Sequence, residues 1–120
     1  MPRTLVFATL AAIHAPLLAQ RVQEAAEPNA TVASATILQC GQEASGTLTS
    51  ALDEDWFRIT LTANRDLRLQ TGPSLNNEIG DTVITLLDVT GAPLQSSDDG
   101  IFTGYYSDLD AKNLPAGTYY

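Results

Sequence analysis

The stretch "WFRITLTA" at residues 56–63 decides the fold class of this chain. Apolar side chains occupy every second position in it, at Phe57, Ile59 and Leu61, and polar residues fill the positions between them. Successive side chains of a β-strand point to opposite faces of the sheet, so this pattern suits a strand with one buried and one solvated face. The stretch therefore predicts a half-buried β-strand near the middle of the chain.

Short apolar runs of the same kind recur on both sides of this stretch. "LRLQT" alternates again, and "TVITLLDV" is nearly all apolar, which is typical of a strand that is covered on both faces. Turn residues separate the runs, as in "NRD", "GPSLNNEIGD", "TGAP", "DDG" and "NLPAG". No stretch of the sequence keeps the 3.6-residue apolar period of a helix. The pattern predicts an all-β fold of about eight short strands, packed as the two sheets of a β-sandwich.

Length, composition and charge narrow the class of protein. The chain has 120 residues, which suits a single domain, and its 44% hydrophobic and 17% charged residues are typical of a globular protein. Lys and Arg total 6 against 14 Asp and Glu, which gives a net charge of −8. A chain this acidic repels the phosphates of nucleic acid and attracts cations. Cys40 is the only cysteine, so no internal disulfide can form.

Residues 1–19 have the pattern of a secretory signal peptide. Arg3 precedes an apolar run that is too short to span a bilayer, and Ala19 suits cleavage after it. A helix in the mature protein is the alternative, which Pro16 disfavours. We therefore expect a secreted, periplasmic or cell-envelope protein with no membrane span. Cleavage would also remove His14, the only histidine, and with it any Ser-His-Asp triad or His-based zinc site.

The rest of the chain divides into a short leading segment and one domain. Residues 20–35 are polar and rich in alanine, so we expect a linker or extended segment there and a β-sandwich domain over 36–120. The last expected strand begins at Gly117 and stops at Tyr120, short of the 5–6 residues of a typical strand. Such a truncated strand leaves backbone groups of its neighbour unpaired. Either the sequence is a fragment of a longer product, which we expect, or a partner adds the missing edge.

A series of motifs along the chain carries a resemblance to a known family. They are "EPNAT" at 27–31, "SGTL" at 45–48, "DEDWFRITL" at 53–61, "DTVITLLD" at 81–88, "GAPLQSSDDG" at 91–100 and "LPAGTYY" at 114–120. In this order they resemble the bacterial pre-peptidase C-terminal domain, a module that trails many secreted proteases and other exported proteins. The resemblance implies a jelly-roll-like β-sandwich of antiparallel strands. It also implies a non-catalytic accessory module that accompanies a parent secreted hydrolase or aids attachment to an extracellular polymer such as collagen.

Three carboxylates crowd into "DED" at 53–55, directly before the predicted strand, where they repel one another unless a cation or open solvent separates them. The resemblance implies calcium, because the related collagen-binding domains of clostridial collagenases hold it between an acidic N-terminal segment and this turn. The matching residues are Glu27, Asn29, Asp53 and Asp55. Each pair is spaced i, i+2, so in an extended segment both oxygen-bearing side chains face one side, and calcium takes oxygen ligands. Those relatives carry further acids where this chain has Ala25 and Ala30, and a solvated acidic turn is the alternative.

Two further groups of residues are candidate sites. The members of a second acidic group are Asp81, Asp98 and Asp99. "DDG" is also ordinary turn chemistry, so a simple turn is the alternative there. The aromatic residues Trp56, Tyr105 and Tyr106 would suit a ligand surface, with packing against the sandwich as the alternative.

We expect a protein without enzyme activity. A glycosidase needs two carboxylates held at a fixed separation across a sugar, whereas the acids of this chain fall in predicted turns. The expected function is that of a secreted accessory or binding module that calcium stabilises. The alternative is a structural envelope protein that pairs with another subunit through its open sheet edge.

Overall fold

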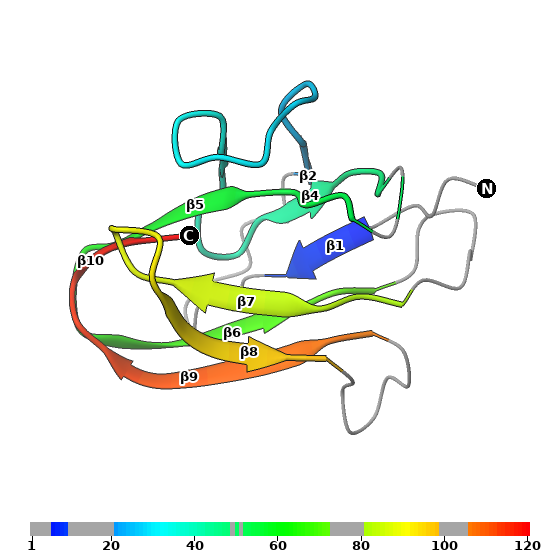
Figure 1. The fold of residues 1–120 in the computed structure, drawn as a ribbon. Helices are drawn as coiled ribbons and strands as arrows, with labels where there is room; N and C mark the ends of the chain where they lie inside the picture. The colour runs from blue at the N-terminus through cyan, green and yellow to red at the C-terminus, as the bar shows by residue number, and fades with distance from the viewer. Residues whose placement is uncertain (1–5, 10–20, 49, 51, 73–80, 99–105) are drawn as a thin grey trace.

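The computed structural model describes residues 6–9, 21–48, 50, 52–72, 81–98 and 106–120. This part of the chain contains β-strands and no helix, so the all-β prediction is confirmed there (Figure 1). The strands are β1 Val6–Thr9, β2 Arg21–Gln23, β3 Thr36–Ile37, β4 Glu43–Ser45, β5 Phe57–Leu61, β6 Arg65–Gln70, β7 Ile84–Leu87, β8 Pro93–Ser97, β9 Asp108–Leu114 and β10 Gly117–Tyr119. They are more numerous than the roughly eight strands that turn spacing predicts. No helix long and apolar enough to cross a membrane is found among the described residues.

β5 is the stretch whose alternating pattern predicts a strand. It lies at the centre of a three-stranded sheet, between β10 and β3. Ile59 and Leu61 are each only 3% exposed, so its apolar face is buried. Arg58 and Thr60, at the positions between, are exposed. The prediction of a half-buried strand is confirmed. The candidate site described below lies beside the start of β5.

Two strand pairs are parallel, which corrects the expectation of antiparallel strands throughout. β2 pairs in parallel with β4, and β3 pairs in parallel with β5. A parallel pair needs a crossover connection of a dozen or more residues. Residues 24–42 join the first pair and residues 38–56 join the second, so both connections are long enough. The alternation within one strand carries no information about the direction of its partner, and this is why the expectation was wrong for these pairs.

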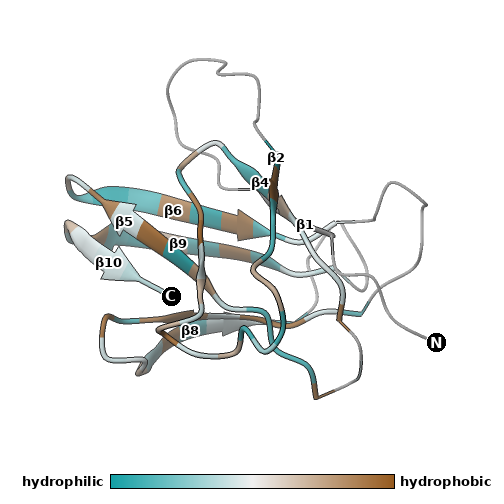
Figure 2. Cartoon of the chain, turned by 90° about the horizontal axis from the view of Figure 1, so that it is seen from above, coloured by the Kyte–Doolittle hydropathy of each residue, from teal (hydrophilic) through white to brown (hydrophobic). Residues whose placement is uncertain are grey.

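The hydrophobic core comes from alternate residues of several strands. β6 pairs with β9 and β7 pairs with β8, both antiparallel, and Leu69 lies opposite Leu109. The largest apolar side chains with at most 1% exposure are Leu38, Leu67, Leu86 and Leu109. Figure 2 shows hydrophobic bands alternating with hydrophilic ones along β5, β6 and β9. The sequence shows the same alternation, and in the fold the apolar side chains of these strands point into one common core.

The end of the chain joins two sheets. β10 runs antiparallel to β5, with Tyr119 opposite Ile59. The next residue, Tyr120, exchanges two backbone hydrogen bonds with Leu87 of β7: its N–H donates to the Leu87 carbonyl at 3.0 Å, and its carbonyl accepts from the Leu87 N–H at 2.6 Å. The chain therefore ends between β5 and β7, as Figure 1 shows.

The start of the chain also forms strands. β1 lies within the predicted signal peptide and pairs antiparallel with β4. The expected cleavage point after Ala19 lies outside the described residues, and the signal peptide stays a prediction. β2 lies within the expected linker, at 21–23, and pairs with β4 on its other edge. The leading segment is therefore attached to the sheet before it reaches the acidic residues that follow.

Candidate metal centre

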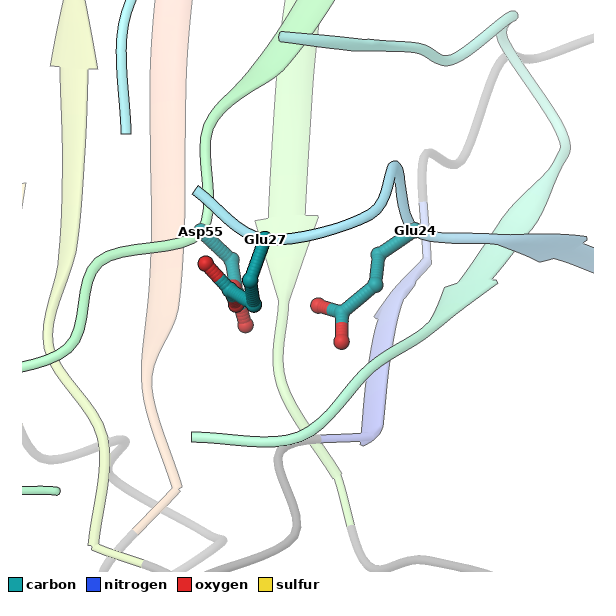
Figure 3. Close-up of side chains that lie close together, drawn as sticks. All are labelled: Glu24, Glu27 and Asp55. Carbon is teal, nitrogen blue, oxygen red and sulfur yellow. The ribbon is translucent and has the colours of Figure 1, made fainter. Parts of the chain in front are cut away.

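Three carboxylates from two distant parts of the chain meet beside the start of β5. Glu24 and Glu27 come from the segment that follows β2, and Asp55 lies two residues before β5. Each offers a carboxylate oxygen, and these oxygens all lie within 4.8 Å of one another. Figure 3 shows the three side chains converging from the two segments. The segment after β2 thus crosses the start of β5 with its acids pointing toward Asp55.

Glu24 is held in place by the backbone of the segment after β4. Its own N–H donates to the Ser45 carbonyl at 2.9 Å, which continues the pairing of β2 with β4. Its Oε1 accepts a hydrogen bond from the Thr47 N–H at 2.8 Å. A Cβ at Gly46 would lie only 1.9 Å from the Glu24 Oε2, so a glycine at this position leaves the room that the carboxylate uses.

Asn29 fixes the turn that carries Glu27. Its side chain is 0% exposed, and its Nδ2 donates to the Ala25 carbonyl at 3.0 Å. Its backbone N–H donates to the Glu27 Oε2 at 3.3 Å. Its Oδ1 is buried without a hydrogen-bond partner. A buried amide oxygen usually has a partner, so this one remains available as a ligand atom.

Asp55 has the most unusual environment in the group. Both of its carboxylate oxygens are buried without a hydrogen-bond partner of ordinary geometry. Burial, followed by the adjacent Glu24 carboxylate, raises the pKa of Asp55 from 3.8 to about 8. The Asn29 side chain lies near enough to lower that pKa in part, and the charge of Asp53 raises it further. Without a cation, this environment therefore favours the protonated form of Asp55.

No Lys or Arg within the described residues forms an ion pair with Glu24, Glu27 or Asp55. Leaving a buried carboxylate unpaired costs several kcal/mol, so the group is stable either with a proton on Asp55 or with a cation among the oxygens. The donors are carboxylate and amide oxygens, which calcium prefers. Zinc sites are built mainly from Cys and His, with Asp or Glu as an additional ligand, and this group contains neither Cys nor His. The oxygen donors present therefore fit a hard cation such as calcium.

The structure brings together three of the four predicted metal ligands and adds one. Glu27, Asn29 and Asp55 lie close together, whereas Asp53 lies outside the group of close oxygens, and the role of these residues as metal ligands stays a prediction. The N–H of Asp53 donates to the Ser50 carbonyl at 3.3 Å, so Asp53 belongs to a turn and the i, i+2 argument for an extended segment does not hold for it. Glu24 was not among the predicted residues because the motif series that carries the resemblance begins at Glu27; an acid three residues before Glu27 was a usable signal.

The other predicted groups are not assembled by the described residues. Asp81 and Asp98 line one groove as exposed side chains, but no group of close acids forms around them in the described part of the chain, and Asp99 lies outside it. Trp56 is half-buried, donates from Nε1 to the Glu54 carboxylate at 3.1 Å, and lies 6.4 Å from the Tyr120 ring. The remaining aromatic residues of that prediction are Tyr106, which is half-buried, and Tyr105, which lies outside the described residues.

Comparison with known proteins finds no matching family model, no matching curated protein and no matching solved structure. The fold is that of a β-protein in which the segment after β2 and the residues just before β5 bring three carboxylates together.

Proposed function

We propose that this chain is a secreted, non-catalytic accessory module with a jelly-roll-like sandwich, stabilised by calcium bound at Glu24, Glu27, Asn29 and Asp55. One observation carries the calcium proposal: Asp55 has two buried oxygens without partners, directly beside two other carboxylates and a buried amide oxygen without a partner. A divalent cation at this point would satisfy all of these atoms at once. The motif series that resembles the pre-peptidase C-terminal domain supports the same function.

Calcium would act as a link between the leading segment and the domain. The segment that carries Glu24 and Glu27 leads into β3, where the Thr36 N–H donates to the Trp56 carbonyl at 2.8 Å beside the start of β5. A cation shared by Glu27 and Asp55 would join the two segments through charge. A ligand that binds only the folded state stabilises it by about 2.7 kcal/mol at one hundred times its dissociation constant. Calcium at extracellular concentrations would therefore raise the thermal stability of the module.

The arrangement supports a binding role over a catalytic one. The three carboxylates converge on one another within 4.8 Å. Glycosidases instead hold two carboxyl groups about 5–10 Å apart with the sugar between them. A module of this kind would serve a parent secreted hydrolase or an extracellular polymer through its surface, with the metal maintaining its shape.

Calcium titration by calorimetry tests this proposal directly. The parent chain is expected to bind calcium with a single site, and Asp55→Asn is expected to lose that binding. Asp110→Asn is the matched control, because Asp110 is an exposed acid that pairs with Lys112 and lies outside the cluster. The proposal fails if the parent chain shows neither heat of binding nor a rise in melting temperature at millimolar calcium.

A further inference from the structure

A hollow beside the turn between β5 and β6 differs in charge from the candidate metal centre. Its volume is about 460 Å³, which lies within the range of small-molecule binding sites. Arg65 is the only charged residue among the described residues that line it. In a chain with a net charge of −8, a hollow with a cation and no acid is a local site of positive potential.

The wall of this hollow is largely apolar. Leu38 and Leu61 line it and belong to the hydrophobic core, with 1% and 3% of their surfaces exposed. Ile37 of β3 lines it as well, but 57% of its surface is exposed. Covering the exposed part of an isoleucine side chain removes apolar area from water and favours binding. The hollow therefore suits a ligand with an apolar group.

Arg65, at the exposed start of β6, has no carboxylate partner within the described residues. The ion pairs found there involve Arg21, Arg68 and Lys112, and none involves Arg65. Its positive charge reaches Cys40, which also lines the hollow: burial raises the pKa of the Cys40 thiol, and Arg65 lowers that pKa in part. A guanidinium binds a carboxylate through two parallel hydrogen bonds. Arg65 is thus placed to bind the carboxylate of a ligand in the hollow.

Uncharged hydrogen-bond donors also line the hollow. They belong to Thr60, Thr62 and Gln39, all of which are exposed. Their hydroxyl and amide groups can donate hydrogen bonds to a carboxylate oxygen. Arg58 lies opposite Ile37 in the pairing of β3 with β5 and adds a second positive charge nearby. Because the whole chain is acidic, it repels ligands with several negative charges, and a single carboxylate is favoured.

We propose that this hollow is a binding site for a small monocarboxylate with an apolar body, the chemistry shared by a short fatty acid and by an apolar residue at the carboxyl end of a peptide. The carboxylate pairs with the Arg65 guanidinium, and the apolar body covers Ile37. A neutral ligand of the same shape loses the first contact and keeps the second. None of the residues that line the hollow belongs to the candidate metal centre, so the site does not depend on the proposed calcium function.

Alkylation of Cys40 measures the occupancy of the hollow. Cys40 is the only cysteine of the chain, so iodoacetamide, followed by mass spectrometry, labels one thiol. The probes are octanoate and N-acetyl-leucine, each with its neutral amide, octanamide or N-acetyl-leucinamide. A carboxylate at twice its dissociation constant should slow the alkylation about threefold, because only unoccupied molecules react. The carboxylate that binds more tightly identifies the source, a fatty acid or a peptide end. No protection by either carboxylate at millimolar concentration, or equal protection by its amide, would overturn the proposal.

Two arginine variants locate the site on the protein. Arg65→Gln should weaken binding of the carboxylates about fivefold, as expected for an exposed charge pair, and leave binding of the amides unchanged. Arg68→Gln is the matched control: it removes the same charge from the same strand, but Arg68 pairs with Asp108 and does not line the hollow. Each variant is compared with its own alkylation rate without probe, since Arg65 also acts on Cys40. Equal binding of the carboxylates by the two variants would refute the site.

Discussion

Replacing Asp55 by asparagine should stabilise the calcium-free protein at high pH. Folding raises the pKa of this carboxyl from 3.8 to about 8, so the folded state disfavours the ionised form. A group of this kind costs nothing below pH 4, where it is protonated in both states, and its penalty grows as the pH rises from 4 to 8. An asparagine side chain at this position would be neutral throughout, and so it would avoid the penalty.

The size of the effect follows from the pKa change and the exposure of the site. Each tenfold change in proton affinity corresponds to about 1.4 kcal/mol. The carboxyl is only half-buried, and solvent screening reduces the full value, so we expect about 2 kcal/mol. For a chain of this length, that amounts to roughly 8 °C in melting temperature.

The measurement is thermal and urea unfolding of the parent and the variant in EDTA at pH 4 and pH 9. Their stabilities should agree at pH 4, and Asp55→Asn should be the more stable at pH 9. Addition of calcium at pH 9 should reverse that order, because only the parent gains from it. Asp66→Asn serves as a control of opposite sign, since the Asn113 N–H and Lys112 lower the pKa of Asp66. A variant less stable than the parent at pH 9 in EDTA would refute the reasoning, because it would show that the Asp55 carboxylate already has a partner.

Further predictions concern Gly46 beside the candidate metal centre, the hydrophobic core and the buried hydroxyl of Ser107. Gly46→Ala should displace the flexible Glu24 carboxylate, because the new Cβ would lie 1.9 Å from the present position of its Oε2. Calorimetry should show a calcium affinity about tenfold weaker than that of the parent. The stability of the calcium-free protein should change by less than about 1 kcal/mol. Leu86→Ala should lower the free energy of unfolding in urea by about 2–5 kcal/mol, because Leu86 is 0% exposed; Leu94→Ala, at 51% exposure, should change it by less than about 1 kcal/mol. Ser107→Ala should cost about 1–3 kcal/mol in the same assay, because it removes the one hydroxyl proton that donates to the backbone carbonyl of Thr82 or of Asp98.

The sequence predicted the local features of the fold. Alternation in "WFRITLTA" is a property of neighbouring residues, and it predicted both the existence of β5 and the burial of Ile59 and Leu61. The alternation did not predict whether a partner strand runs parallel or antiparallel. β3 and β5 run in parallel because a long connection returns the chain to the same edge, and such a return leaves no periodic trace in either strand.

The candidate site shows the same division. Glu27, Asn29 and Asp55 were found from spacing and from a resemblance, and the structure brings them together. Glu24 was not predicted, and Asp53 lies outside the group of close oxygens, because which acids meet depends on where a turn ends and how β2 pairs.

The amino-acid order by itself indicated that the alternating or apolar runs of β5, β6 and β7 are strands, which faces of β5 and β6 are apolar and where the acids are concentrated, since these depend on side chains a few residues apart. Only the tertiary structure decided that Glu24 reaches Asp55 from a distant part of the sequence and that their oxygens are shielded from water. Desolvation and charge repulsion act through space, so the raised pKa of Asp55 and its fit to a cation arise only when distant segments are packed together.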